Sequence, residues 1–109
     1  DYIQDDREKL VSNGRIILVV EDDESFARIL YDLAHEQNFQ CLIATTVEEA
    51  LRLAVQYLPS GVILDVMLPD HSGLSVLDRL KNDTRTRHIP VHVVSAHDNS
   101  KTAFSLGAM

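Results

Sequence analysis

The sequence predicts an α/β fold in which helices cover both faces of a parallel sheet, a doubly wound arrangement. Short apolar runs recur along the chain, and continuous runs of this kind are typical of strands that are buried on both faces. Segments with apolar residues at helical spacing separate the runs. This alternation of strand and helix implies parallel strands joined by right-handed crossovers. The length of 109 residues suits one such domain.

Each predicted strand is an apolar run that ends at a polar residue. In chain order, the runs span residues 16–20, 41–44, 61–64 and 91–94. The first run stops at an acidic stretch that begins with Glu21, and the third stops at Asp65. The fourth is introduced by Pro90 and stops at Ser95. Ligands of doubly wound sheets bind beyond the carboxyl ends of the strands, so these end residues are the first candidates for a site.

Each predicted helix follows a strand and carries one apolar stripe. In chain order, the helices span residues 25–37, 47–58, 72–82 and 99–106. The second helix begins with a capping box, in which the Thr46 hydroxyl caps the third amide and the Glu49 carboxylate reaches back. Pro59 ends this helix. The fourth helix has the least regular stripe, and Gly107 is its expected stop.

Charge and composition disfavour several classes of function. The formal net charge is −7 and the pI is about 5.0, which disfavours nucleic acid as a partner because such binding needs clustered cations. No apolar run approaches the ~20 residues of a membrane-spanning helix, and the first residues do not show the basic, apolar and small-residue pattern expected of a signal peptide. We therefore expect this domain to contact neither nucleic acid nor a membrane. The single cysteine, Cys41, excludes an internal disulfide and is typical of a reducing compartment.

The strand ends bring oxygen-bearing side chains together. Glu21 and Asp22 follow the first predicted strand, Asp65 closes the third, and Ser95 closes the fourth. If the first and third strands are neighbours, their carboxylates converge. Two carboxylates about 4 Å apart repel by roughly 4 kcal/mol at an effective dielectric constant of about 20. Either one of them takes up a proton or a cation sits between them.

A cation at these carboxylates suits phosphoryl transfer. Oxygen ligands without thiolate or imidazole favour Mg²⁺, with Mn²⁺ as the alternative. In such a site one carboxylate attacks phosphorus, and the metal neutralises the equatorial oxygens of the phosphoryl group. The hydroxyl of Ser95 can donate a hydrogen bond to one of those oxygens. Because the carboxylates repel phosphate until the cation is present, we expect the reaction to depend on the metal.

The chain resembles the receiver domain of two-component response regulators. The resemblance extends from about Arg15 to the end of the chain and depends on several pieces in order, namely residues 18–23, 64–70 with Gly73, 93–96 and 107–108. It implies a flavodoxin-like sheet of five parallel strands in the order 2-1-3-4-5. It also implies a domain over 15–109, preceded by an acidic linker over 1–14.

The resemblance implies a role for each candidate residue. Asp65 is the phosphoacceptor, and Ser95 is the hydroxyl that moves toward the aspartyl phosphate. Glu21 and Asp22 belong with Asp65 to the acidic metal pocket, and Met67 supplies a backbone carbonyl to the metal. The implied function is a cytoplasmic phosphorelay step. Asp65 takes a phosphoryl group from a histidine kinase or a histidine phosphotransfer domain in a Mg²⁺-dependent reaction, and the domain signals by a conformational change rather than acting as an enzyme.

Within that family, the chain is most similar to receivers of hybrid sensor histidine kinases, through residues 5–7, 26–30 and 86–92. The family's conserved lysine, its fifth strand and its last helix have no counterpart in the sequence. We therefore expect a fragment that is truncated at its C-terminus. We also expect self-association through the fourth strand, since an unpaired edge invites another chain.

Other classes of function remain as alternatives. A pseudo-receiver, which binds a partner without being phosphorylated, is left open by the missing lysine. An aspartate-nucleophile phosphatase typically needs a second carboxylate two residues beyond the nucleophile, where this chain has Met67. A nucleotide-binding domain is disfavoured because no glycine-rich fingerprint follows the first strand.

Overall fold

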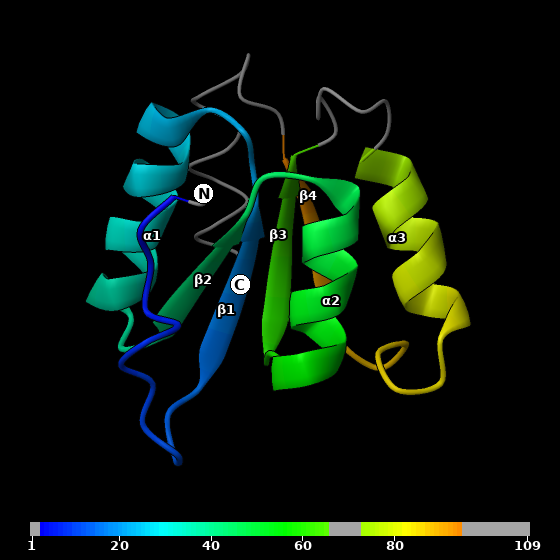
Figure 1. Ribbon diagram of the computed structural model, residues 1–109, viewed down its shortest axis with the longest axis horizontal. Helices are drawn as coiled ribbons and strands as arrows, with labels where there is room; N and C mark the ends of the chain where they lie inside the picture. Colours follow the sequence, from blue (N-terminus) through cyan, green and yellow to red (C-terminus); the bar gives the residue numbers. More distant parts are fainter. Residues whose placement is uncertain (1–2, 66–72, 95–109) are drawn as a thin grey trace.

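The fold is a sheet with helices on both faces (Figure 1). The computed structural model describes residues 3–65 and 73–94. In chain order, the described elements are β1 (Ile16–Val20), α1 (Glu24–Glu36), β2 (Gln40–Ala44), α2 (Val47–Tyr57), β3 (Gly61–Asp65), α3 (Gly73–Asn82) and β4 (Val91–Val94). Their order and type agree with the alternation that the sequence predicts over this part of the chain.

All neighbouring strands are parallel, and the sheet has the order β2-β1-β3-β4. Helix α1 packs on one face, whereas α2 and α3 lie side by side on the other. The predicted doubly wound, flavodoxin-like topology is therefore confirmed for these strands. The expected fifth strand and the expected helix over 99–106 concern a part of the chain outside the described residues.

Two apolar clusters, one on each face of the sheet, form the core. Alternate residues of β1 point to opposite faces: Leu18 and Val20 join the cluster beneath α2 and α3, and Ile17 and Val19 join the cluster beneath α1. The side chains of Val19 and Val20 in β1 are fully buried. This two-sided burial explains why the strand is a continuous apolar run rather than an alternating one.

The helix ends follow the capping residues. Asp23 caps α1 by accepting a hydrogen bond from the backbone N–H of Phe26 at 3.1 Å, so the helix begins one residue earlier than the sequence predicts. Thr46 accepts from the backbone N–H of Glu49 at 3.2 Å, as expected of a capping box. Helix α2 ends at Tyr57.

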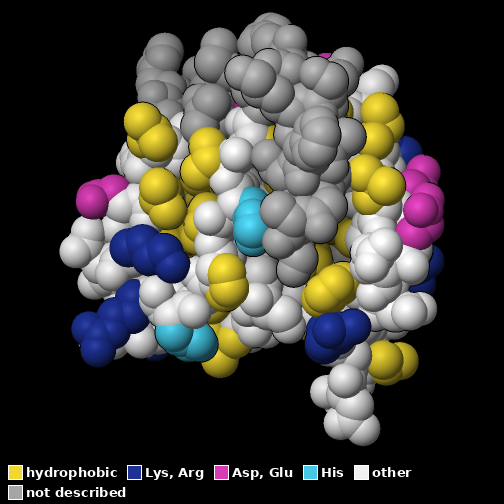
Figure 2. Space-filling view, turned by 180° about the vertical axis from the view of Figure 1, so that it is seen from behind, with side chains coloured by type: hydrophobic (Ala, Val, Ile, Leu, Met, Phe, Trp, Pro, Cys, Tyr) yellow, Lys and Arg dark blue, Asp and Glu magenta, His cyan; other side chains and the backbone are white. Residues whose placement is uncertain are grey.

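On the far side of the molecule, hydrophobic side chains alternate with charged and polar ones, and acidic side chains gather at the side of α1 (Figure 2). Among the described residues, no helix is long and apolar enough to cross a membrane.

Candidate metal centre

An acidic pocket lies at the carboxyl ends of β1 and β3. We use this name for Glu21, Asp22 and Asp65, whose carboxylates each offer an oxygen within 4.8 Å of the others. Glu21 is only 1% exposed and Asp65 only 2%, whereas Asp22 is open to solvent. Among the residues that the structure describes, this is the one group of potential metal ligands that lies so close together.

The strand register produces this convergence. Val20 pairs with Leu64 across β1 and β3, so the residues that follow them, Glu21 and Asp65, reach the same edge of the sheet. Beyond β1 the chain is held in place, because the backbone N–H of Glu21 donates to the carbonyl of Ala44 at 2.8 Å. The sequence expectation that these carboxylates meet at the strand ends agrees with this geometry.

The carboxylate of Glu21 accepts a hydrogen bond at only one of its two oxygens among the described residues. Its Oε2 accepts a hydrogen bond from the backbone N–H of Asp23 at 3.0 Å. Its Oε1 is buried and has no hydrogen-bond partner among residues 3–65 and 73–94. A buried polar atom without a partner is costly and is rare in folded proteins, and no donor or cation from the described part of the chain reaches this oxygen.

The pKa of Glu21 also indicates that the pocket is short of positive charge. The pKa of Glu21 is raised to about 8. Burial, which removes water from the carboxylate, is the largest cause, and the neighbouring Asp65 and Asp22 add to it, whereas the hydrogen bond from Asp23 acts against it. The carboxyl of Glu21 therefore holds its proton near neutral pH when no cation is near. A divalent cation would supply the missing partner and favour the ionised form.

The donor set fits a hard divalent cation. The pocket offers carboxylate oxygens, and no thiolate or imidazole is part of it. Mg²⁺ prefers such ligands, uses few of them from the protein, and keeps water in its other positions. Both the donor chemistry and the unpartnered Oε1 of Glu21 are consistent with Mg²⁺ held by Glu21, Asp22 and Asp65.

Two of the predicted site residues are not placed. Met67, expected to give a backbone carbonyl, and Ser95, expected to give a hydroxyl, lie outside the described residues. Sequence reasoning also missed one contributor, the carbonyl of Ala44 that anchors Glu21. No sequence signal marks this contact, because any residue can supply a backbone carbonyl.

The sheet order and the acidic pocket at its switch point define a flavodoxin-like signalling fold of the receiver type. The chain belongs to the response regulator receiver domain family, whose family model matches residues 17–109. The resemblance drawn from the sequence is thereby confirmed.

Curated relatives include response regulators of Brucella. The polar-differentiation response regulator DivK of Brucella ovis is 36% identical over 80 residues, which are 73% of this chain and 65% of DivK. The chain thus spans slightly less than two thirds of the curated relatives it matches.

Solved structures share the fold. A sensor protein from Polaromonas sp. JS666 has a TM-score of 0.72 and 28% identity, with 84% of this chain and 77% of that chain covered. The receiver domain of sensor histidine kinase PA1611 from Pseudomonas aeruginosa PAO1, with a magnesium ion coordinated in its active site cleft, has a TM-score of 0.71 and 20% identity, with 76% and 68% covered.

Proposed function

We propose that this chain is a phosphoacceptor receiver domain in which Asp65 takes a phosphoryl group in a Mg²⁺-dependent reaction. The observation that carries the proposal is the acidic pocket, where three carboxylates converge and one buried oxygen has no partner among the described residues. Family membership supports the same role. The donor is a histidine kinase or a histidine phosphotransfer domain.

In the proposed reaction, a carboxylate oxygen of Asp65 attacks the phosphorus of a phosphohistidine. The new O–P bond forms as the N–P bond breaks, and the donor imidazole keeps the electron pair and takes up a proton from water. Mg²⁺ would supply positive charge that offsets the negative charge of the phosphoryl oxygens in the transition state.

The remaining pocket residues have supporting roles. Glu21 and Asp22 hold the cation together with Asp65, and without the cation the remaining negative charge of the pocket repels the incoming phosphoryl group. Met67 contributes a backbone carbonyl to the cation. The hydroxyl of Ser95 moves toward the phosphoryl group and donates a hydrogen bond to it. This movement is the step that passes the signal on.

The proposed bounds and cellular compartment of the domain follow from the sequence. The domain comprises residues 15–109, preceded by the acidic segment 1–14, and acts in the cytoplasm, where a reducing environment suits the single buried Cys41. The chain signals through its phosphorylated state and is not a metabolic enzyme. An exposed outer edge of β4 would allow self-association.

The test is phosphorylation by a small donor. The purified full-length protein is mixed with Mg²⁺ and acetyl phosphate, and its intact mass is read with and without a chelator. The proposal expects the gain of one phosphoryl group, lost with the chelator and in Asp65→Asn. If the folded protein binds Mg²⁺ and still gains no mass, the domain is a pseudo-receiver that acts by binding alone.

A further inference from the structure

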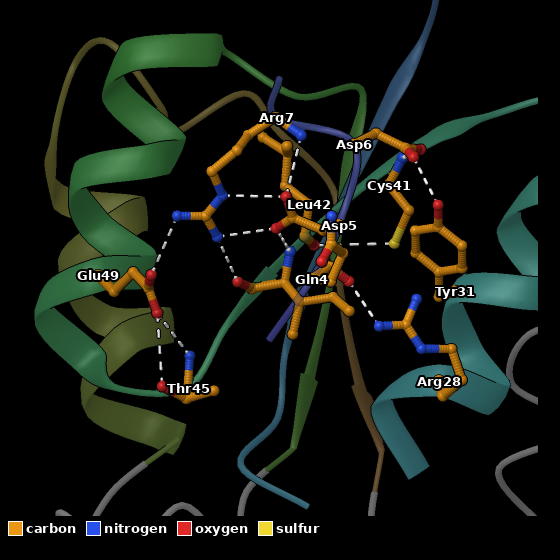
Figure 3. A network of polar contacts seen from close by, with 11 residues as sticks. Gln4, Asp5, Asp6, Arg7, Arg28, Tyr31, Cys41, Leu42, Thr45 and Glu49 are labelled. Carbon is orange, nitrogen blue, oxygen red and sulfur yellow. Dashed lines mark hydrogen bonds and ion pairs between the residues drawn. The ribbon is translucent and has the colours of Figure 1, made fainter. Parts of the chain in front are cut away.

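The N-terminal chain lies along the outer edge of β2 (Figure 1). We call residues 4–7 the strap. Its two acidic residues, Asp5 and Asp6, are buried at 5% and 3% exposure, although they belong to a polar, acidic stretch of sequence. Figure 3 shows the strap between β2, α1 and α2, in contact with all of them.

The outer edge of β2 is formed by Cys41 and Ile43. Gln40 donates its backbone N–H to Arg15, and Ala44 accepts at its carbonyl from Glu21, so residues 40 and 44 direct their backbone groups toward β1 and beyond. Backbone groups alternate in direction along a strand. The N–H and C=O groups of Cys41 and Ile43 therefore point away from the sheet.

The strap provides a partner for every one of these outward groups. The backbone N–H of Asp6 donates to the carbonyl of Cys41 at 3.0 Å, and the N–H of Cys41 donates to the Asp6 carboxylate at 2.8 Å. The N–H of Ile43 donates to the Asp5 carboxylate at 2.7 Å, and the Arg7 guanidinium donates to the carbonyl of Ile43 at 2.9 Å. Three residues thus make the hydrogen bonds that a neighbouring strand would otherwise make.

Side chains fix the strap to both flanking helices. On the α1 side, the hydroxyl of Tyr31 donates to Asp6 at 2.6 Å, and Nε2 of His35 lies 2.7 Å from the same carboxylate. On the α2 side, the Arg7 guanidinium contacts Glu49 at 3.3 Å. Arg7 also forms a two-point ion pair with Asp5. These anchors hold the strap in one position over the edge.

The edge beneath the strap is suited to pairing. The strand Gln40–Ala44 carries no charge and no proline. An uncharged, apolar edge strand with unpaired backbone groups is a template for another chain, and proteins commonly cover such edges. Since the strap satisfies the edge by side chains and a short piece of backbone, it competes directly with an incoming strand.

We propose that the strap guards a strand-addition site on β2, and that β2 pairs with β2 of a second copy of this chain when the strap leaves. The second copy is favoured by symmetry. In an antiparallel pair centred on Leu42, Cys41 of each copy lies opposite Ile43 of the other. Each such pair exchanges two hydrogen bonds, so all the outward groups of both edges are satisfied, as in a self-complementary two-fold interface.

The test removes the strap contacts without shortening the chain. The variant Asp5→Ala, Asp6→Ala, Arg7→Ala is compared with the parent chain by sedimentation velocity over a wide range of concentration. The expected result is a dimer that forms as concentration rises in the variant. Hydrogen exchange then locates the interface: the amides of Cys41 and Ile43 exchange at least about tenfold faster in the dilute variant than in the parent, and they become protected again in the dimer.

The matched control is Asp32→Ala, Glu36→Ala, Arg52→Ala, which removes the same charges from exposed positions on α1 and α2. It is expected to behave as the parent does. Association through β4 would appear equally in the parent and the control, so it is subtracted by this comparison.

Either of two results would overturn the proposal. One is a folded variant that stays as monomeric as the parent at every concentration. The other is a dimer in which the amides of Cys41 and Ile43 remain unprotected. If the triple variant does not fold, Arg7→Ala is read in the same way. It removes the partner of the Ile43 carbonyl and leaves both aspartates in place.

Discussion

Two pairs of buried acidic residues differ in what balances their charge. Asp5 and Asp6 in the strap are about as buried as Glu21 and Asp65 in the acidic pocket. The strap carboxylates accept hydrogen bonds from backbone N–H groups and from arginine and tyrosine side chains. In the pocket, the buried Oε1 of Glu21 accepts none from the part of the chain that the structure describes.

The difference appears in the pKa values. Burial acts to raise the pKa of Asp6, but bonds from Tyr31, Cys41 and His35 outweigh it and hold the pKa below its ordinary value. The pKa of Glu21 is raised, with burial as the largest cause. Where the protein supplies its own donors, a buried carboxylate stabilises the fold. Where it supplies too few, the carboxylate is set up for an external cation.

The largest effect should come from removing a strap carboxylate. Asp6→Ala leaves the N–H of Cys41 buried without a partner and frees Tyr31 from its acceptor, so we expect the free energy of unfolding to fall by about 2 to 4 kcal/mol. Urea unfolding measures it. Asp32→Ala, at an exposed position on α1, is the control and should change stability by less than about 0.5 kcal/mol. Equal effects of the two substitutions would contradict the structural role of Asp6.

In the pocket, replacing a buried carboxylate should raise the free energy of unfolding instead of lowering it. Glu21→Gln removes a carboxyl whose charge is unfavourable when no metal is bound, so the metal-free protein should gain about 1 to 3 kcal/mol in unfolding free energy at mildly alkaline pH. Calorimetry should also show that Mg²⁺ binds more weakly to the variant. A loss of stability without metal would mean that the ionised Glu21 is already balanced within the protein.

The pH dependence of stability should separate the regions. Asp6, whose pKa is lowered in the folded state, stabilises the fold above its ordinary pKa of 3.8, and this contribution is lost as pH falls through the folded value. Tyr31, His35, Lys9 and the N–H of Cys41 are the groups that face it. Urea unfolding at acidic pH should show a steeper loss in the parent than in Asp6→Asn.

Glu21 acts in the other direction. Its folded pKa lies above its ordinary value of 4.5, at about 8. The metal-free fold therefore loses stability as pH rises between these values, and the slope ends above the upper one. Saturating Mg²⁺ or Glu21→Gln should remove this slope in denaturant unfolding. An unchanged slope in Glu21→Gln would assign the pH dependence to another group.

The smallest effect is expected from Arg7→Lys. Lysine keeps the positive charge but cannot form the two-point pair with Asp5 while also reaching the carbonyl of Ile43 and the carboxylate of Glu49. We expect a loss of about 1 kcal/mol in unfolding free energy, and faster exchange of the Ile43 amide. A lysine variant as stable as the parent would show that the charge alone holds the strap.

The fold and the acidic pocket could be predicted because both depend on local patterns. Apolar runs such as Ile16–Val20 mark strands that are covered on both faces. Once the strands are parallel, the residues at their carboxyl ends share one edge, which brings Glu21 to Asp65. Periodicity and strand order therefore suffice to find the pocket.

The strap could not be predicted in this way. Residues 4–7 show no periodicity, and an acidic stretch such as this indicates a linker when only its composition is considered. Asp6 and Asp5 find their partners 35 and 38 residues away, at Cys41 and Ile43. The capping box shows the same limit on a smaller scale, since the Glu49 carboxylate reaches the N–H of Thr45, one residue before the cap.

The most direct test of the central contrast is the titration of Glu21 itself. Carboxyl-selective NMR of the labelled protein, with Glu21→Gln to assign the signal, gives the pKa of this group with and without Mg²⁺. We expect a pKa near 8 without metal and a fall to well below neutrality when Mg²⁺ binds. A pKa close to the ordinary value of 4.5 in both conditions would contradict it, because the pocket would then need no external cation.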